Sequence, residues 1–106
     1  MKLYEILLPT TNTIECRNLH KEWDKKICKI SGGLTILKER GMGKWVSEDL
    51  STITETVLSV RIACEPQQMQ AIAQITAEHY NQHSVIYYEI GNAYIVKKET
   101  HGRRNA

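Results

Sequence analysis

The chain has 106 residues, enough for one domain and too few for two. Its apolar fraction of 42% and charged fraction of 25% are typical of globular domains, which excludes the disordered and fibrous classes. The net charge of +2 arises at the end of the chain, because positions 97–106 hold four Lys or Arg residues and one Glu, a sum of +3 that leaves −1 for the rest. A body without excess positive charge argues against a nucleic-acid partner.

Apolar runs and cysteines indicate the compartment. No apolar run approaches the roughly 20 residues that a membrane helix needs, so no membrane partner is expected. The first residues, MKLYEILLPTTNT, carry Glu5 within their apolar stretch and lack an A-x-A cleavage pattern, which favours a strand over a signal peptide. Three widely spaced cysteines, Cys16, Cys28 and Cys64, are typical of free thiols in a reducing cytosol. We therefore expect a cytoplasmic protein.

The first strand and helix are predicted from alternation and helical spacing. Residues 3–8 alternate weakly and end at Pro9, which cannot donate to a strand ladder. Asn18 is predicted to cap the following helix of about 13 residues, because its side chain can accept from the first free backbone N–H groups. Apolar residues at helical spacing mark the buried stripe: Leu19, Trp23, Ile27 and Ile30. Gly32 and Gly33 are expected to end this helix.

Two strands and a glycine-rich turn are predicted next. Residues 34–38 and 44–47 would pair across the turn at residues 39–43. Residues 41–44, Gly-Met-Gly-Lys, do not match a phosphate loop, which needs four residues between its glycines and a helix after its lysine. We interpret them as part of a hairpin turn. After a polar turn, the longest strand is predicted at residues 53–64.

The last third of the chain predicts a helix and a hairpin. Pro66 suits the first turn of a helix, whose buried face would hold Met69, Ile72, Ala73, Thr76 and Tyr80. Residues 84–90 and 93–98 would form a hairpin, because Gly91 can supply the positive φ of the two-residue turn. Without the extra hairpins the order is βαββαβ, which predicts an α+β ferredoxin-like sandwich with two helices on one face of an antiparallel sheet. This domain would span residues 1–98, followed by a flexible basic tail at residues 99–106.

The longest predicted strand has two different faces. Leu58, Val60, Ile62 and Cys64 share one wholly apolar face that should lie under the helices. The other face mixes charged and aliphatic residues, and the last hairpin would pair Tyr87 with Val96 and Glu89 with Tyr94. Such a mixed face is not typical of an open sheet surface, so a second copy of the chain is expected to cover it in a homodimer. The candidate ligand or interface residues are Glu55, Val57, Arg61, Tyr87, Glu89 and Tyr94.

Other motifs favour structural interpretations. His79 and His83 stand four residues apart, but Asn81 is predicted to end the helix between them and no third metal ligand is indicated, so no metal is expected. Cys28 has no base marked by the sequence, and a buried thiol is preferred over a nucleophile. Trp23 and Trp45 are interpreted as packing residues.

One pattern in the chain is similar to a known family. Trp23, GGLT at residues 32–35, Gly43-x-Trp45, Glu55 and Tyr80-x-Gln82-x-Ser84-Val85 together resemble a family of small bacterial proteins known only as a domain of unknown function. That resemblance implies a fold of this type and no established activity. The predicted architecture is also similar to dimeric α/β-barrel proteins, among them small monooxygenases and isomerases.

Three functional hypotheses follow. The leading one is a homo-oligomeric domain that binds a small ligand or a partner, without a cofactor. The alternative is a cofactor-free enzyme of the dimeric α/β-barrel type, with Glu55, Tyr87 or His83 in proton transfer. The third is a nucleic-acid accessory protein that uses the basic tail. The sequence leaves open whether the protein is an enzyme.

Overall fold

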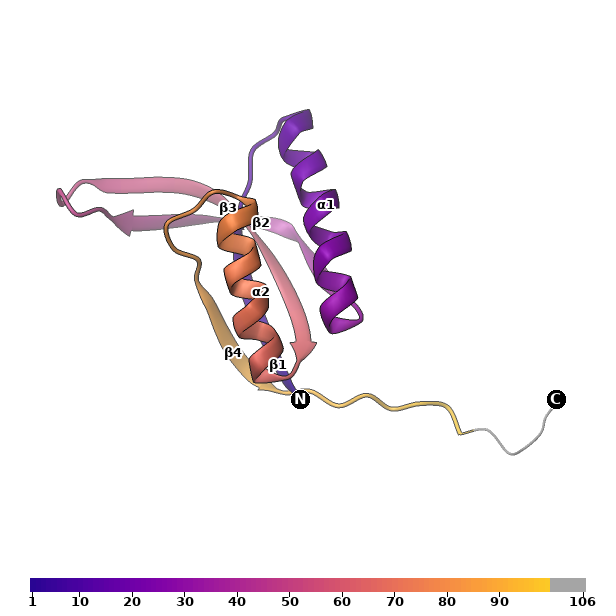
Figure 1. The fold of residues 1–106 in the computed structure, drawn as a ribbon. Coiled ribbons are helices and arrows are strands. Elements are labelled where there is room, and N and C mark those ends of the chain that lie inside the picture. Colours follow the sequence, from indigo (N-terminus) through magenta and orange to yellow (C-terminus); the bar gives the residue numbers. More distant parts are fainter. Residues whose placement is uncertain (100–106) are drawn as a thin grey trace.

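The computed structural model describes residues 1–99, and residues 100–106 of the predicted flexible tail lie outside that part. The elements follow the predicted order βαββαβ: β1 (Lys2–Pro9), α1 (Ile14–Ser31), β2 (Thr35–Val46), β3 (Thr52–Cys64), α2 (Pro66–His79) and β4 (Tyr87–Asn92). The four strands form one antiparallel sheet in the order β2-β3-β1-β4. Both helices lie on the same face of that sheet (Figure 1), which confirms the ferredoxin-like α+β class.

Helix α1 begins earlier than predicted. Thr13, not Asn18, is the N-cap, and its hydroxyl oxygen accepts from the backbone N–H of Cys16 at 3.1 Å. Asn18 lies inside the helix, because the chain already turns at Thr13 and the helix gains another turn that buries Cys16. The C-terminal prediction is confirmed, since Gly32 has φ 87° and donates its N–H to the carbonyl of Cys28.

The core between the helices and the sheet is as predicted, except that Leu19 of the predicted α1 stripe is 37% exposed. On β3, Leu58, Val60, Ile62 and Cys64 are all buried under the helices. The antiparallel register places Tyr4, Ile6 and Leu8 of β1 beside them. The helices complete the core with four buried side chains: Trp23 and Ile27 of α1, and Met69 and Ile72 of α2. The Trp23 indole donates to the Thr76 hydroxyl at 2.9 Å, so its polar nitrogen is satisfied where the two helices meet.

The glycine-rich segment is part of a strand, which corrects the prediction of a turn at residues 39–43. Strand β2 runs through it and pairs with β3 as far as Val46 opposite Thr52. A Cβ atom on Gly43 would lie 2.9 Å from the Trp45 ring, so glycine is needed there for space and not for a turn. The actual turn lies between β2 and β3, where the Asp49 carboxylate accepts from the Ser51 backbone N–H at 3.0 Å and from the hydroxyls of Ser47 and Ser51. These bonds lower the pKa of Asp49 to about 2.

The predicted last hairpin is also wrong. Gly91 lies in β4 opposite Leu3 and does not take a positive φ, so the chain does not turn back there. Residues 93–99 have no regular secondary structure and form no strand, and the pairs Tyr87–Val96 and Glu89–Tyr94 do not form. Figure 1 shows this segment leading away from the sheet, and the β2–β3 hairpin extending beyond the helices on the other side. Within residues 1–99, no helix is long and apolar enough to cross a membrane.

Candidate functional site

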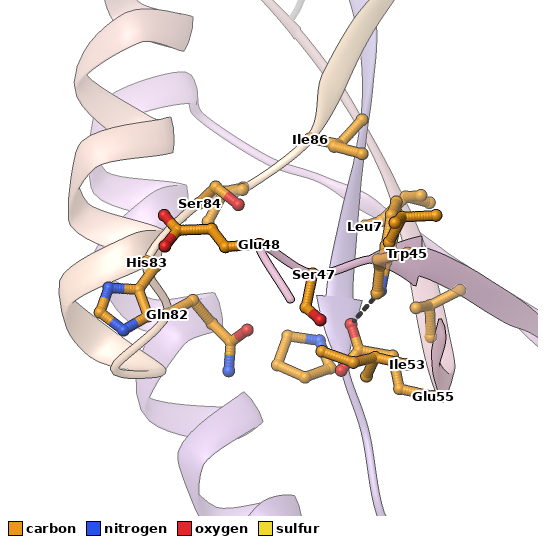
Figure 2. A pocket seen from close by; sticks show the side chains of 14 residues that line it. Leu7, Trp45, Ser47, Glu48, Ile53, Glu55, Gln82, His83, Ser84 and Ile86 are labelled. Atoms are coloured by element: carbon orange, nitrogen blue, oxygen red, sulfur yellow. Dashed lines mark hydrogen bonds between the residues drawn. The ribbon is translucent and has the colours of Figure 1, made fainter. Parts of the chain in front are cut away.

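The sheet face opposite the helices contains a groove of about 640 Å³. Its floor and walls come from β1, β2 and β3, and the segment after α2 closes one side (Figure 2). Apolar side chains form much of the lining: Leu7, Trp45, Ile53, Val57, Val85 and Ile86. A concave, partly apolar cavity of this size is within the range that small molecules occupy.

A tryptophan and a carboxylate are in contact in the groove. The Trp45 indole N–H donates to Oε1 of Glu55 at 2.8 Å, the bond drawn in Figure 2. The β2–β3 register produces this contact, because Glu55 lies opposite Gly43 and the missing side chain leaves room for the Trp45 ring. Gly41 and Gly43 both lie against Val57, since a Cβ atom added to either would be 3.3 Å from that side chain. The sequence predicts a packing role for Trp45, whereas the structure shows that it lines the groove.

The rim of the groove is polar and negatively charged. Glu48 comes from the β2–β3 turn, and Gln82, His83 and Ser84 come from the segment between α2 and β4. Among the described residues that line the groove, two are carboxylates and none is Lys or Arg. A wall with two carboxylates and an aromatic ring favours a ligand with a positive charge.

A second polar cluster lies on the same sheet face, where β4, β1 and β3 are neighbours. Arg61 Nε donates to Oε1 of the buried Glu5 at 3.0 Å, and the Tyr88 hydroxyl donates to the other carboxylate oxygen. Burial by itself raises the pKa of Glu5, but the hydrogen bonds from Tyr88 and Arg61 lower it by more, so the pKa lies below its ordinary value. The hydrogen bond between Tyr88 and Glu5 also raises the pKa of Tyr88. This cluster explains how one buried charge is accommodated on the face without helices.

The structure separates the six residues predicted from the sequence. It brings Glu55 and Val57 together in the groove. Arg61 belongs to the Glu5 cluster, and Glu89 forms an ion pair with Lys2 at 3.7 Å. Tyr87 lies on the helix side of the sheet, where its ring meets Tyr4 edge-on at 5.8 Å, and Tyr94 is 82% exposed.

One expectation about this face changes, and three groove residues are additional to the predicted set. Val57 is only 6% exposed in the single chain, so its burial does not require a second subunit. The predicted candidate residues do not include Glu48, Gln82 or Trp45, which come from the β2–β3 turn, the segment after α2 and strand β2.

The predicted histidine pair does not form a metal site. His79 bonds to the Leu19 carbonyl at 2.8 Å and lies 3.0 Å from Lys26 Nζ, whereas His83 lies at the groove. Within residues 1–99, no three His, Cys, Asp or Glu side chains come together as metal ligands would.

Comparisons with known proteins support the fold. No protein-family model matches the chain, and no curated protein does. CutA1 from Pyrococcus horikoshii has a TM-score of 0.62 at 8% identity, over 92% of this chain and 88% of that one. A divalent cation tolerance protein (CutA1) from Thermus thermophilus has a TM-score of 0.63 at 6% identity, over 88% and 86%. A phage SAM lyase in its apo state has a TM-score of 0.54 at 19% identity, over 97% and 91%.

These likenesses extend over most of each chain and establish a shared ferredoxin-like architecture. The predicted resemblance is thereby confirmed at the level of the fold, while membership of the family of small bacterial proteins stays a prediction. The chain has the fold of the CutA1 proteins.

Proposed function

We propose that this protein is a homo-oligomer that binds a small organic cation in the groove on the open sheet face. The contact between Trp45 and Glu55 is the observation that carries this proposal, because it places a carboxylate against an aromatic ring inside a partly apolar cavity. The indole donates to Oε1 of Glu55 and holds the carboxylate in place, and Oε2 would face the positive charge of the ligand. Glu48 adds a second carboxylate at the rim.

The ligand would combine apolar and charged parts. Leu7, Ile53 and Ile86 offer aliphatic surface to a ring or chain, while the carboxylates favour an ammonium or sulfonium group. Gln82 and Ser84 provide hydrogen-bonding groups for the polar part of such a ligand. A nucleoside that carries a sulfonium, such as S-adenosylmethionine (SAM), has all three features. The name of the phage SAM lyase, which shares this fold, suggests SAM as a first probe.

Exposed apolar residues support the oligomeric part of the proposal. Several lie on the projecting hairpin, and others follow β4: Ile36, Met42, Val46, Ile53, Tyr94, Ile95 and Val96. Strands β2 and β4 are the edges of the sheet and leave backbone groups unpaired along their outer sides. A closed assembly of identical chains would cover both the apolar side chains and an edge. The sequence predicts a dimer, and light scattering would give the number of copies.

Calorimetry with a matched pair of ligands tests the binding proposal. SAM has a sulfonium charge that S-adenosylhomocysteine lacks, and we expect SAM to bind at least tenfold more tightly. Glu55→Gln should remove that preference and leave the affinity for S-adenosylhomocysteine nearly unchanged, because the carboxylate charge is lost and the side-chain shape is kept. Glu22→Gln, on the exposed side of α1, is the control. Equal affinities for the two ligands in the wild-type protein would contradict a cation site.

A second candidate function is lyase chemistry on the same ligand. The phage SAM lyase supports it, because that likeness extends over 97% of this chain and combines with a groove suited to a sulfonium. Of the residues predicted for proton transfer, Glu55 and His83 line the groove, whereas Tyr87 lies on the other side of the sheet. We expect the protein to consume SAM without an added cofactor, and His83→Gln and Glu55→Gln to slow this. Chromatography of the products measures turnover. Tight binding of SAM without turnover would contradict lyase chemistry and support the binding function only.

The remaining proposals concern compartment and nucleic acid. Three free cysteines support a cytoplasmic location. Nucleic-acid binding has no support from the described body of the protein, whose groove is acidic.

A further inference from the structure

A cysteine and a histidine lie side by side on the helix side of the molecule. Cys16 belongs to the first turn of α1, and His20 follows one turn later. Cys16 Sγ is 3.4 Å from His20 Nε2, a distance at which thiol and imidazole share a hydrogen bond. Tyr80, directly after α2, approaches the other ring nitrogen, with its hydroxyl 2.5 Å from His20 Nδ1. A nucleophile, a base and a group that orients the base are thus in contact.

The sulfur is also surrounded by groups that stabilise a thiolate. The Thr11 backbone N–H donates to Cys16 Sγ at 3.3 Å. The Thr10 hydroxyl lies 3.9 Å from the sulfur and 3.1 Å from His20 Nε2, so it can support either group. A thiolate accepts all of these bonds, whereas a thiol has a proton that must itself be placed.

Charged and titratable groups nearby lower the pKa of both Cys16 and His20. Burial raises the pKa of Cys16, but the hydrogen bonds from Thr11 and Thr10 and the charge of Arg40 lower it by more, so the net shift is downward. Burial, Arg40 and His79 lower the pKa of His20, which keeps the imidazole neutral and able to take a proton.

Tyr80 remains a neutral phenol in this cluster. Burial, with smaller contributions from Asp24 and Cys16, raises its pKa far above the usual range. The neutral hydroxyl can therefore accept from Nδ1–H of His20 and leave Nε2 as the proton acceptor that faces the sulfur.

We propose that Cys16 is a nucleophilic thiol that small hydroperoxides oxidise, with His20 as its base and Tyr80 as a positioning residue. His20 Nε2 takes the thiol proton, and the thiolate attacks one peroxide oxygen. A sulfur–oxygen bond forms while the oxygen–oxygen bond breaks. Cys16 becomes a sulfenic acid, the peroxide is reduced, and the proton on His20 converts the leaving hydroxide to water. Cys16 is only 9% exposed, so a small oxidant such as hydrogen peroxide is favoured over larger ones.

The other two cysteines are internal references. Cys28 is exposed, which corrects the prediction of a buried thiol, and it has no such arrangement of donors and base among the described residues. Cys64 is buried in the core, where burial and Glu65 raise the pKa of its thiol. If Cys16 reacts faster than both the exposed Cys28 and the buried Cys64, neither exposure nor burial alone accounts for its reactivity.

The experiment treats the full chain with hydrogen peroxide at pH 6.5, traps sulfenic acid with dimedone, and locates the adduct by mass spectrometry. We expect Cys16 to be labelled at least tenfold faster than Cys28 or Cys64. The pH profile of alkylation by iodoacetamide should give Cys16 a midpoint below the value of about 8.5 for a free thiol. Labelling of Cys28 before Cys16, or a Cys16 midpoint at or above 8.5, would overturn the proposal.

Two variants test the roles of the neighbours. His20→Gln should slow peroxide oxidation of Cys16 at least tenfold and shift its alkylation midpoint upward, because the base is removed. Tyr80→Phe removes only the hydroxyl that orients His20 and should shift the same profile by a smaller amount. Circular dichroism confirms that each variant is folded, and Cys28 labelling in each sample is the control for general exposure. Unchanged Cys16 profiles in both folded variants would overturn the assigned roles.

Discussion

The two faces of the sheet are built from the same strands, yet they are completed in different ways. On the helix side, alternate residues of β1 and β3 are aliphatic or aromatic and are sealed by α1 and α2. On the other side, the intervening residues form a charged cluster around Glu5 and an open groove around Glu55. A face closed by the chain's own helices provides stability, and the face without helices retains room for a ligand.

The largest expected effect is the loss of stability when a core residue on the helix side of the sheet is truncated. Trp23→Ala or Ile27→Ala should lower the free energy of unfolding by about 2–5 kcal/mol, because each removes a fully buried side chain from between the helices and the sheet. Lys21→Ala and Lys25→Ala, on the exposed side of α1, should change it by less than about 0.5 kcal/mol. Urea denaturation measures both, and equal losses at the two kinds of position would mean that the core is misplaced.

A smaller effect concerns the charged cluster on the open face. Glu5→Gln should cost about 1–3 kcal/mol at pH 7, because the hydrogen bonds from Arg61 and Tyr88 lose their charged acceptor.

The same cluster predicts how stability depends on pH. The folded-state pKa of Glu5 lies below its ordinary value of 4.5, so its contribution is present above that pH and is lost as the pH falls through the folded value. The folded-state pKa of Tyr88 lies above its ordinary value of 10.0, so its contribution is present below that pH and is lost as the pH rises through the folded value. Glu5→Gln should flatten the acid limb of a stability–pH curve and Tyr88→Phe the alkaline limb. Because the two residues share one hydrogen bond, each substitution should also weaken the other limb, though by less. A variant that leaves its own limb unchanged would refute the assignment.

The groove should respond to substitution in function more than in stability. Trp45→Phe keeps an aromatic ring and removes the donor to Glu55, so unfolding free energy should change by no more than about 1.5 kcal/mol, the net value of one hydrogen bond. Calorimetry should show at least a tenfold loss of SAM affinity, since the carboxylate is no longer held. A stability loss as large as that of Trp23→Ala would place Trp45 in the core instead.

The smallest effect is expected at the end of the chain. Removing residues 102–106, Gly-Arg-Arg-Asn-Ala, should leave the melting temperature nearly unchanged, because these residues offer little apolar surface to bury. A calorimetric scan of the shortened chain against the full chain measures this. A drop of several degrees would show that the tail packs against the domain.

Local patterns of the sequence predicted more of the closed face than of the groove. The period-two alternation of β3 correctly assigned Leu58, Val60 and Ile62 to the core, and the same alternation placed Glu55 and Val57 on the opposite face. Glycine was the misleading signal. Gly41, Gly43 and Gly91 were interpreted as turn residues, but each lies in a strand, the first two beneath the side chains of Val57 and Trp45. A glycine required for space cannot be distinguished by sequence from one required for a turn.

The sequence by itself determined the order of the elements, the helical stripe of Trp23 and Ile27 and the two faces of β3, because these depend on spacing along one segment. Only the tertiary structure decided that Trp45 bonds to Glu55, since that contact requires the register of β2 on β3. It also decided that Gln82 and His83 close the groove, and that Tyr80 meets His20 across 60 positions of the chain. Such contacts follow from how the strands and helices pack together, which the spacing within any one segment does not encode.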